Sequence, residues 1–219
     1  MYIAIEGVIG VGKTTLARLL QPVFQSEILL EIFEENPFLS NFYADRQRYA
    51  FQTQIFFLLS RYHQQRRAVP EILSTDASLI ADYTFEKDAL FASINLQGDE
   101  LEMYYRVHEA LAEKIPLPDL IVYLSADIDV LMQRISQRDR TYERNMERGY
   151  IQQLTQAYNA FFAQSQSDVA VRKVPVLTID TDHLDYVRHP EDLKKVETLV
   201  RQALKLVPFQ EKLPLPDIE

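Results

Sequence analysis

The sequence predicts an α/β fold in which helices cover both faces of a five-stranded parallel sheet. Five short apolar runs, rich in Ile, Leu and Val, have the length and composition of buried strands. Segments with helical periodicity separate these runs along the chain. A glycine-rich stretch over residues 7–12 joins the first run to the first helical segment. Strands that alternate with helices in this way form a parallel sheet between two helical layers.

The expected elements follow one another in a regular order. The predicted strands are Tyr2–Glu6, Ile28–Glu31, Leu79–Asp82, Leu120–Leu124 and Val174–Ile179. The predicted helices are Thr14–Phe24, Arg46–Gln65, Glu100–Lys114, Asp129–Ser136, Glu147–Ala163 and Pro190–Leu206. No linker divides the chain, so we expect a single domain over residues 1–206. Residues 207–219 contain three prolines and are expected to form an irregular C-terminal tail.

Composition excludes several classes of protein. The chain has 219 residues, a formal net charge of −9 and no cysteine. The acidic charge argues against general nucleic-acid binding. The absence of cysteine excludes disulfides and thiolate metal sites. No apolar run approaches the roughly 18 residues that a membrane span needs. No signal-peptide pattern precedes the first strand. We therefore expect a cytoplasmic protein without a membrane or nucleic-acid partner.

The glycine-rich stretch belongs to a phosphate-binding motif. Residues 7–14 read GVIGVGKT and fit G-x-x-x-x-G-K-[ST], with a strand before and a helix after. Backbone N–H groups of such a loop wrap the phosphates, and the helix N-terminus adds its dipole. Lys13 would reach the β- and γ-phosphates, and the Thr14 hydroxyl would bind Mg²⁺. The expected ATP ligands in this loop are Gly7, Gly10, Val11, Gly12, Lys13, Thr14 and Thr15. The motif predicts a P-loop NTPase-type three-layer α/β/α fold that binds ATP with Mg²⁺.

Two carboxylates are expected at the carboxyl edge of the sheet, where α/β ligand sites form. Glu31 ends the second predicted strand, and a carboxylate there can take the proton of a hydroxyl during phosphoryl transfer. Glu34 and Glu35 are nearby rivals, but they fall beyond the expected strand end. A solvated glutamate is the alternative interpretation of Glu31. Asp82 follows the third apolar run and suits Mg²⁺ or its water shell.

The helix predicted over residues 46–65 carries candidates for nucleobase recognition. Gln54, Leu58 and Arg61 lie on one helical face because they are spaced by four and three residues. An amide can both accept and donate hydrogen bonds at the edge of a base, and an arginine can donate two hydrogen bonds to the same edge. Three aromatic residues of the same helix could stack on a base or belong to the core: Phe51, Phe56 and Phe57.

Positive charge gathers in the segment RISQRDRTYERNMER, residues 134–148. A charge run is by default a solvated helix face. Guanidinium groups also match phosphate oxygens and offset charge in a phosphoryl-transfer transition state. The sequence therefore leaves both a surface role and a phosphate-binding role open for Arg134, Arg138 and Arg140.

Five segments in this order resemble the deoxynucleoside kinase family, especially its bacterial deoxyadenosine/deoxyguanosine kinase branch. They are IEGVIGVGKTT, LLEIFEENPFLSNFY, FYADRQRYAFQTQIFFLLSRYHQQ, LIADYTFEKDALFA and RISQRDRTYERNMER. The resemblance runs from Met1 to about Leu206. It implies ATP-dependent phosphorylation of a deoxynucleoside 5′-hydroxyl in nucleotide salvage, with purines preferred and deoxycytidine as an alternative. It also implies a homodimer formed through helices that flank the base site.

The resemblance implies roles for the acceptor-site residues. Glu31 is expected to be the general base, and Gln54 to read the nucleobase. Arg61 would support the base pocket, and Asp88 would belong to the same pocket and pair with Arg61. Tyr43 would contact the 3′-hydroxyl of the sugar.

The arginine-rich segment resembles the family's lid, with the pattern Arg-x-Arg-x-x-Glu over residues 138–143. We expect a helical lid over about residues 138–148. The resemblance assigns Arg138 and Arg140 to the ATP phosphates, with Arg134 as a helper. Glu143 would contact the sugar 3′-hydroxyl.

The sequence departs from the family at Tyr83. The family usually has Asp/Glu-Arg-Ser where this chain has Asp82-Tyr83-Thr84. The missing arginine normally helps to hold the base carboxylate and the transferring phosphate. The resemblance therefore leaves the detailed phosphate clamp of this chain open.

Two other functions remain as alternatives. A thymidylate-type kinase has an ionised phosphate as acceptor, which needs no base and would be repelled by a carboxylate at Glu31. Such an enzyme is also expected to have an arginine beside Asp82. A non-catalytic ATP-binding regulatory module explains the phosphate loop, but it leaves Glu31, Gln54 and the arginines without a joint purpose.

Overall fold

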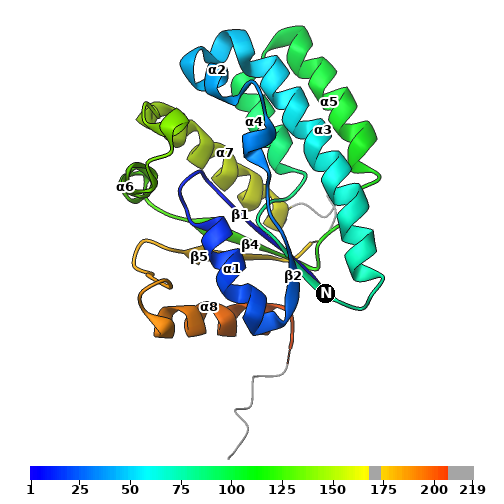
Figure 1. Cartoon of the computed structure of the whole chain (residues 1–219), viewed down its shortest axis with the longest axis vertical. Coiled ribbons are helices and arrows are strands. Elements are labelled where there is room, and N and C mark those ends of the chain that lie inside the picture. Colours follow the sequence, from blue (N-terminus) through cyan, green and yellow to red (C-terminus); the bar gives the residue numbers. More distant parts are fainter. Residues whose placement is uncertain (168–173, 207–219) are drawn as a thin grey trace, which may run out of the picture.

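Figure 1 shows the computed structural model of the chain, which describes residues 1–167 and 174–206. Its sheet consists of β1 (Tyr2–Gly7), β2 (Ser26–Leu29), β3 (Ser78–Ala81), β4 (Leu120–Ser125) and β5 (Val176–Asp180). The strand order is β2-β3-β1-β4-β5, and all neighbours are parallel. The predicted five-stranded parallel sheet is confirmed.

The centre of the sheet is buried on both faces. All six residues of β1 are buried, and β3 and β4 beside it are almost entirely so. Strands covered on both faces read as continuous apolar runs rather than as alternating patterns. This explains why IAI in β1 and LIVYL in β4 were recognisable as strands from the sequence.

Helices form a layer on each side of the sheet, as Figure 1 shows. One layer consists of α1 (Lys13–Phe24) and α8 (Pro190–Ala203), which contact each other. The opposite layer is larger and consists of α2 (Leu39–Ala44), α3 (Arg46–Leu73), α4 (Lys87–Asn95), α5 (Gly98–Ala112) and α7 (Arg148–Ser167). The helix α6 (Ile128–Arg138) packs against α7. Two single-turn 3₁₀ helices are η1 (Phe33–Glu35) and η2 (Thr141–Glu143).

The second strand ends earlier than predicted. The sequence places its end at Glu31, but β2 ends at Leu29. The cause is Asp82, which directly follows β3. Its backbone N–H donates to the Leu29 carbonyl, and its side chain then accepts the Glu31 N–H at 2.8 Å. The carboxylate takes the place of a strand partner, so the chain leaves the sheet before Glu31.

Several helix boundaries also differ from the predictions. The helix predicted over Arg46–Gln65 is α3, which continues to Leu73. The helices α2 and α4 and both 3₁₀ turns were not predicted, because short helices carry too few apolar repeats for a periodic signal. The last strand begins at Val176 rather than Val174. The predicted tail, residues 207–219, lies outside the described residues. No helix in the described part of the chain is long and apolar enough to span a bilayer.

The phosphate loop connects β1 to α1 and requires its glycines. Gly7 has a φ of +149°, and a Cβ atom there would lie 2.4 Å from the backbone oxygen of Leu124. Gly12 has a φ of +104° and precedes the first residue of α1. Glycine adopts such backbone angles without steric penalty. The glycines therefore let the loop turn tightly at the carboxyl edge of the sheet.

Candidate active site

A cavity of about 820 Å³ opens at the carboxyl edge of the sheet. It lies between the phosphate loop, the segment after β2, the helices α3 and α4, and the lid segment between α6 and α7. Thirteen residues singled out from the sequence line it, namely Gly10, Lys13, Thr14, Glu31, Tyr43, Gln54, Phe57, Arg61, Asp82, Asp88, Arg138, Arg140 and Glu143. The fold thus brings together side chains from every segment that the sequence analysis selected.

A second cleft, of about 1680 Å³, lies on the other side of the phosphate loop. The loop between β5 and α8, residues 182–189, forms one wall. The predicted ATP ligands in this cleft are Gly10, Val11, Gly12, Thr15, Arg134 and Arg138. Gly10 and Arg138 line both cavities. The two spaces therefore meet at the phosphate loop and the start of the lid segment.

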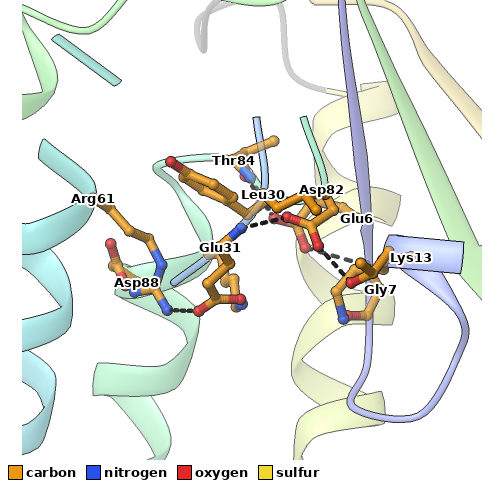
Figure 2. A network of polar contacts seen from close by, with 12 residues as sticks. Glu6, Gly7, Lys13, Leu30, Glu31, Arg61, Asp82, Thr84 and Asp88 are labelled. Carbon is orange, nitrogen blue, oxygen red and sulfur yellow. Dashed lines mark hydrogen bonds and ion pairs between the residues drawn. The ribbon is translucent and has the colours of Figure 1, made fainter. Parts of the chain in front are cut away.

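We call the 820 Å³ cavity the acceptor cavity, because the family resemblance implies that the nucleoside binds among its residues. At its centre is a chain of ion pairs, part of which is drawn in Figure 2. Glu31 contacts Arg61 through one carboxylate oxygen and Lys87 through the other. Arg61 also contacts Asp88. Lys87 and Asp88 are neighbours in the first turn of α4. The start of this helix therefore supplies the first and the last side chain in the series of ion pairs. The order is Lys87, Glu31, Arg61 and Asp88, with alternating charge.

These cations decide the protonation state of Glu31. Burial alone would raise the pKa of its carboxyl group. Arg61 and Lys87 outweigh burial and hold the pKa of Glu31 well below its ordinary range. Glu31 is therefore an ionised, hydrogen-bond-accepting carboxylate at neutral pH. Glu34 and Glu35, its rivals in the sequence, lie on the exposed turn η1 and outside the cavity.

Asp82 links three elements of the site. One carboxylate oxygen accepts the Glu31 N–H at 2.8 Å, and the other accepts the Thr14 hydroxyl at 2.5 Å. The carboxylate thereby joins the end of β3 to the start of α1. A hydroxyl and a carboxylate are the hard oxygen donors that Mg²⁺ prefers. The side chains of Thr14 and Asp82 therefore fit the predicted magnesium site.

Lys13 lies at the bottom of the phosphate loop. Its ammonium group donates to the carbonyl oxygens of Gly7 at 2.7 Å and Val8 at 3.2 Å. Burial, and then the positive charge of Lys87, lower the pKa of Lys13 to about 8. A bound phosphate would favour the charged form again and raise this pKa.

The lowered pKa of Lys13 predicts that the protein takes up a proton when it binds a nucleoside triphosphate. Free Lys13 loses its proton as the pH rises through about 8, whereas the bound form keeps it. At about pH 8.5 we expect an uptake on the order of half a proton per MgATP, with much less uptake near pH 7. Calorimetric titration in two buffers of different ionisation enthalpy measures it. Uptake that persists in Lys13→Met would contradict the assignment.

The wall formed by α3 and α4 is polar and deeply buried. Gln54 is 2% exposed, Arg61 5% and Asp88 1%. The Thr53 hydroxyl, also in this wall, and the second oxygen of Asp88 have no hydrogen-bond partner in the described part of the chain. Buried polar groups normally have such partners. The wall can therefore pair with the edge of a polar planar ligand.

One of the three candidate phenylalanines lines the cavity. The Arg61 guanidinium lies 4.6 Å from the centre of the Phe57 ring, which faces the cavity. Phe51 packs against the core, as the core interpretation predicts. Phe56 is half-buried and makes an edge contact with Phe38, so it belongs neither to the core nor to the cavity lining. Of the three, Phe57 alone is placed to meet a ligand in this cavity.

The lid segment closes the acceptor side of the cavity. Arg138 forks onto Glu143, with N–O distances of 2.6 to 2.9 Å. Arg140 lies 4.0 Å above the Phe33 ring, which follows β2. Tyr142 stacks on Tyr43 of α2, with ring centres 5.9 Å apart. Two aromatic contacts therefore connect the lid to the acceptor side.

Arg134 lies further from the acceptor cavity. Its guanidinium donates to Val11 O at 3.3 Å and to both oxygens of Thr181, the hydroxyl at 2.9 Å and the carbonyl at 2.8 Å. These contacts tie α6 to the phosphate loop and to the end of β5. Arg134 therefore shapes the wall of the second cleft.

Tyr83 does not enter the site. Its side chain is fully buried among the apolar residues near β3, and its hydroxyl donates to Gln64 at 2.6 Å. The contact with Glu31 that the family's arginine would make is made in this chain by Lys87. The sequence analysis missed Lys87. Its position directly before Asp88 was the available signal.

Glu6 was also missed, although it organises the site from beneath. Its buried carboxylate accepts the Gly7 N–H at 3.1 Å and the Thr84 N–H at 2.6 Å (Figure 2). It also accepts the Tyr158 hydroxyl at 3.1 Å. These bonds fix the first residue of the phosphate loop relative to the segment after β3. A carboxylate inside an apolar strand was the signal in the sequence.

Comparisons with known proteins identify the family of the chain. A family model described as "Deoxynucleoside kinase" matches residues 3–205. A deoxyguanosine kinase from Bacillus subtilis (strain 168) is 36% identical over 203 residues, which cover 93% of this chain and 97% of the relative. A deoxyadenosine kinase from Dictyostelium discoideum is 33% identical over 184 residues, 82% of this chain and 71% of the relative. A solved structure of deoxyadenosine kinase from M. mycoides with bound dCTP superposes with a TM-score of 0.77 and 25% identity, covering 92% of this chain and all (100%) of that one.

Proposed function

Because the chain belongs to the deoxynucleoside kinase family, and is therefore a phosphotransferase that phosphorylates a deoxynucleoside, we propose that its preferred acceptors are deoxyadenosine and deoxyguanosine. ATP would be the donor. The observation that carries this proposal is the cavity itself, in which Gln54, Arg61 and Asp88 line the same space as Glu31 and Lys13. The purine preference draws on the similar kinases, which are named for deoxyguanosine and deoxyadenosine.

Deoxycytidine is a second candidate acceptor. An amide, a guanidinium and a carboxylate together offer donors and acceptors that can serve the edge of a cytosine as well as a purine. The related deoxyadenosine kinase from M. mycoides was solved with dCTP bound, which supports this candidate.

The acceptor site would hold the deoxynucleoside at three points. Gln54 would bind the edge of the base, with Arg61 and Asp88 beside it. Tyr43 and Glu143 would hold the 3′-hydroxyl. The 5′-hydroxyl would then point to Glu31, whose ionised carboxylate accepts its hydrogen bond and later its proton.

The donor site would hold ATP between the phosphate loop and the lid. Backbone N–H groups of the loop would surround the phosphates, and Lys13 would lie at the β,γ-bridge. Arg138 and Arg140 would approach the transferring phosphoryl group from the lid. Arg138 is now paired with Glu143, so a bound phosphate would compete for its guanidinium.

Magnesium would accompany ATP, held by Thr14 and Asp82 directly or through water. Bound there, it would neutralise charge on the β- and γ-phosphates. The protein's own part in the reaction is to align the 5′-oxygen with the phosphorus and to accept the released proton. Its cations offset the negative charge of the transition state.

A thymidylate-type monophosphate kinase fits this site less well. Its acceptor phosphate would lie against the ionised carboxylate of Glu31, and like charges repel. A regulatory ATP-binding module would have no use for an ionised carboxylate in a cavity beside the phosphate loop. Both alternatives leave the ion-pair chain from Asp88 to Lys87 without a role.

We also propose that the enzyme is a cytoplasmic homodimer. The surface of α3 and α5, which flank the base site, carries the exposed apolar side chains Leu59 and Met103, 41% and 54% exposed. Burial of such side chains favours association. Sedimentation measurements would give the oligomeric state, and a monomer at micromolar concentration would contradict this part of the proposal.

The lid assignment predicts the effect of Arg140→Ala. We expect turnover to fall by about tenfold or more while deoxynucleoside affinity changes little, because the guanidinium acts on charge that develops in the transition state. Steady-state kinetics and calorimetric binding would measure both. Arg144→Ala is the matched control, since Arg144 pairs with Asp139 and lines neither cavity. If Arg140→Ala changes only nucleoside affinity, the lid assignment is wrong.

The acceptor preference is tested by competition. Equal concentrations of deoxyadenosine, deoxyguanosine, deoxycytidine and thymidine are offered with a limiting amount of MgATP, and the monophosphates are separated. We expect dAMP and dGMP to dominate, with dCMP as the next product. Preferential formation of dTMP would contradict the proposed preference.

A further inference from the structure

Lys87 lies where the proposed reaction needs a positive charge. Its side chain is only 7% exposed, and its ammonium group contacts the carboxylate oxygen of Glu31 that Arg61 leaves free. We propose that Lys87 is a catalytic residue whose ammonium group binds the phosphoryl group as it moves from ATP to the 5′-oxygen. This inference rests on the proposed function of the cavity and of Glu31.

The position of Glu31 limits where the reacting phosphorus can be. The 5′-oxygen must lie within hydrogen-bond reach of Glu31 to lose its proton. The phosphorus must lie between that oxygen and Lys13 of the phosphate loop. An ammonium group bonded to Glu31 and lining the same cavity as Lys13 is therefore a close neighbour of the transferring group.

The two lysines also affect each other. Both ammonium groups line the same cavity, Lys13 from the phosphate loop and Lys87 from the start of α4. Two ammonium groups that line one largely buried cavity repel each other. An anion between them would remove the repulsion and bind to both. A phosphoryl group is such an anion.

Lys87 has hydrogen-bonding capacity left for a ligand. An ammonium group has three N–H donors. Within the part of the chain that the structure describes, its one hydrogen-bond acceptor is Glu31, and it also lies 5.6 Å from the centre of the Phe91 ring. Asp82, the other carboxylate nearby, is engaged by Thr14 and the Glu31 N–H.

The transfer step balances with Lys87 protonated throughout. The 5′-oxygen forms a bond to the γ-phosphorus while the bond from that phosphorus to the β,γ-bridging oxygen breaks. The electron pair of the broken bond leaves with ADP, and the 5′-hydroxyl proton passes to the Glu31 carboxylate. Lys87 offsets the charge on the phosphoryl oxygens during the step.

Product binding tests this role without catalysis. Calorimetry measures the affinities of deoxyguanosine and of dGMP, whose 5′-phosphate represents the transferred group. In Lys87→Met we expect dGMP affinity to fall about tenfold or more and deoxyguanosine affinity to change less than about threefold. Lys87→Arg should fall in between, and Lys114→Met, on an exposed lysine outside both cavities, should match the wild type. Equal losses for the two ligands in Lys87→Met would overturn the proposal. A wild type that binds neither ligand would instead refute the proposed function.

Removing Lys87 in the Glu31→Gln background separates direct contact with the phosphoryl group from an effect through Glu31. Single-turnover transfer to deoxyguanosine is compared in Glu31→Gln and Glu31→Gln/Lys87→Met. If Lys87 binds the phosphoryl group, it should still contribute about tenfold without the Glu31 charge. The pair remains usable if Lys87→Met alone fails to fold, because Glu31→Gln removes the carboxylate that would be left without Lys87. Equal rates for the two variants would show that Lys87 acts only as the counter-ion of Glu31, and the proposal would be wrong.

Discussion

Glu31→Gln is expected to reduce the turnover of deoxynucleoside phosphorylation by roughly 10²–10⁴-fold, the usual effect of removing a general base. The amide keeps the size of the side chain but cannot accept the 5′-hydroxyl proton as a base. Deoxynucleoside affinity should survive, because Gln54, Tyr43 and Glu143 would still hold base and sugar. Steady-state turnover and calorimetric affinity for deoxyguanosine measure the two effects separately.

Glu34→Gln and Glu35→Gln are the matched controls for this variant. Both side chains are exposed on η1 and lie outside the cavity, so turnover should stay close to that of the wild type. A large loss in either control, with Glu31→Gln active, would move the general base to that residue. If none of the three variants loses turnover, base catalysis fails, and a monophosphate acceptor, which needs no base, becomes the better explanation.

Lys13→Ala is expected to lower turnover about a hundredfold or more, because the variant lacks the charge that meets the β,γ-bridge of ATP. The fold should not suffer. Folding lowers the pKa of Lys13, so the charged form destabilises the folded state at neutral pH, and its removal should leave the melting temperature unchanged or higher.

Turnover and thermal unfolding of Lys13→Ala are measured side by side, with Lys114→Ala as the control on an exposed lysine. Near-normal turnover would contradict the assignment of the phosphate loop. A large drop in melting temperature would show instead that Lys13 supports the fold through its bonds to Gly7 and Val8.

The sheet and the phosphate loop could be predicted from the sequence because their signals are local. A buried central strand such as β1 is a continuous apolar run, and the loop from Gly7 to Thr14 is a contiguous motif. Gln54 and Arg61 could be selected together because helical spacing places them on one face. Their meeting with Glu31 and Asp88 in one cavity follows from the family resemblance and the fold, and not from spacing alone.

The rest depends on contacts between distant segments. Glu31 leaves the strand because Asp82, 51 residues later, captures its N–H. Lys87 gains its place from the packing of α4 against α3, and neither the length nor the position of α4 has a periodic signal. Tyr142 of η2 stacks on Tyr43 of α2, about a hundred residues earlier in the sequence. A single sequence does not contain such pairings, which arise only when the chain folds.

The central claim is that the chain transfers the γ-phosphoryl group of ATP to the 5′-hydroxyl of a purine deoxynucleoside. The most direct measurement incubates the protein and MgATP labelled with ³²P in the γ-position with deoxyguanosine or with dTMP, and identifies the labelled product. We expect labelled dGMP from deoxyguanosine and no labelled dTDP from dTMP. Labelled dTDP without labelled dGMP would contradict the claim and identify the acceptor as a nucleoside monophosphate.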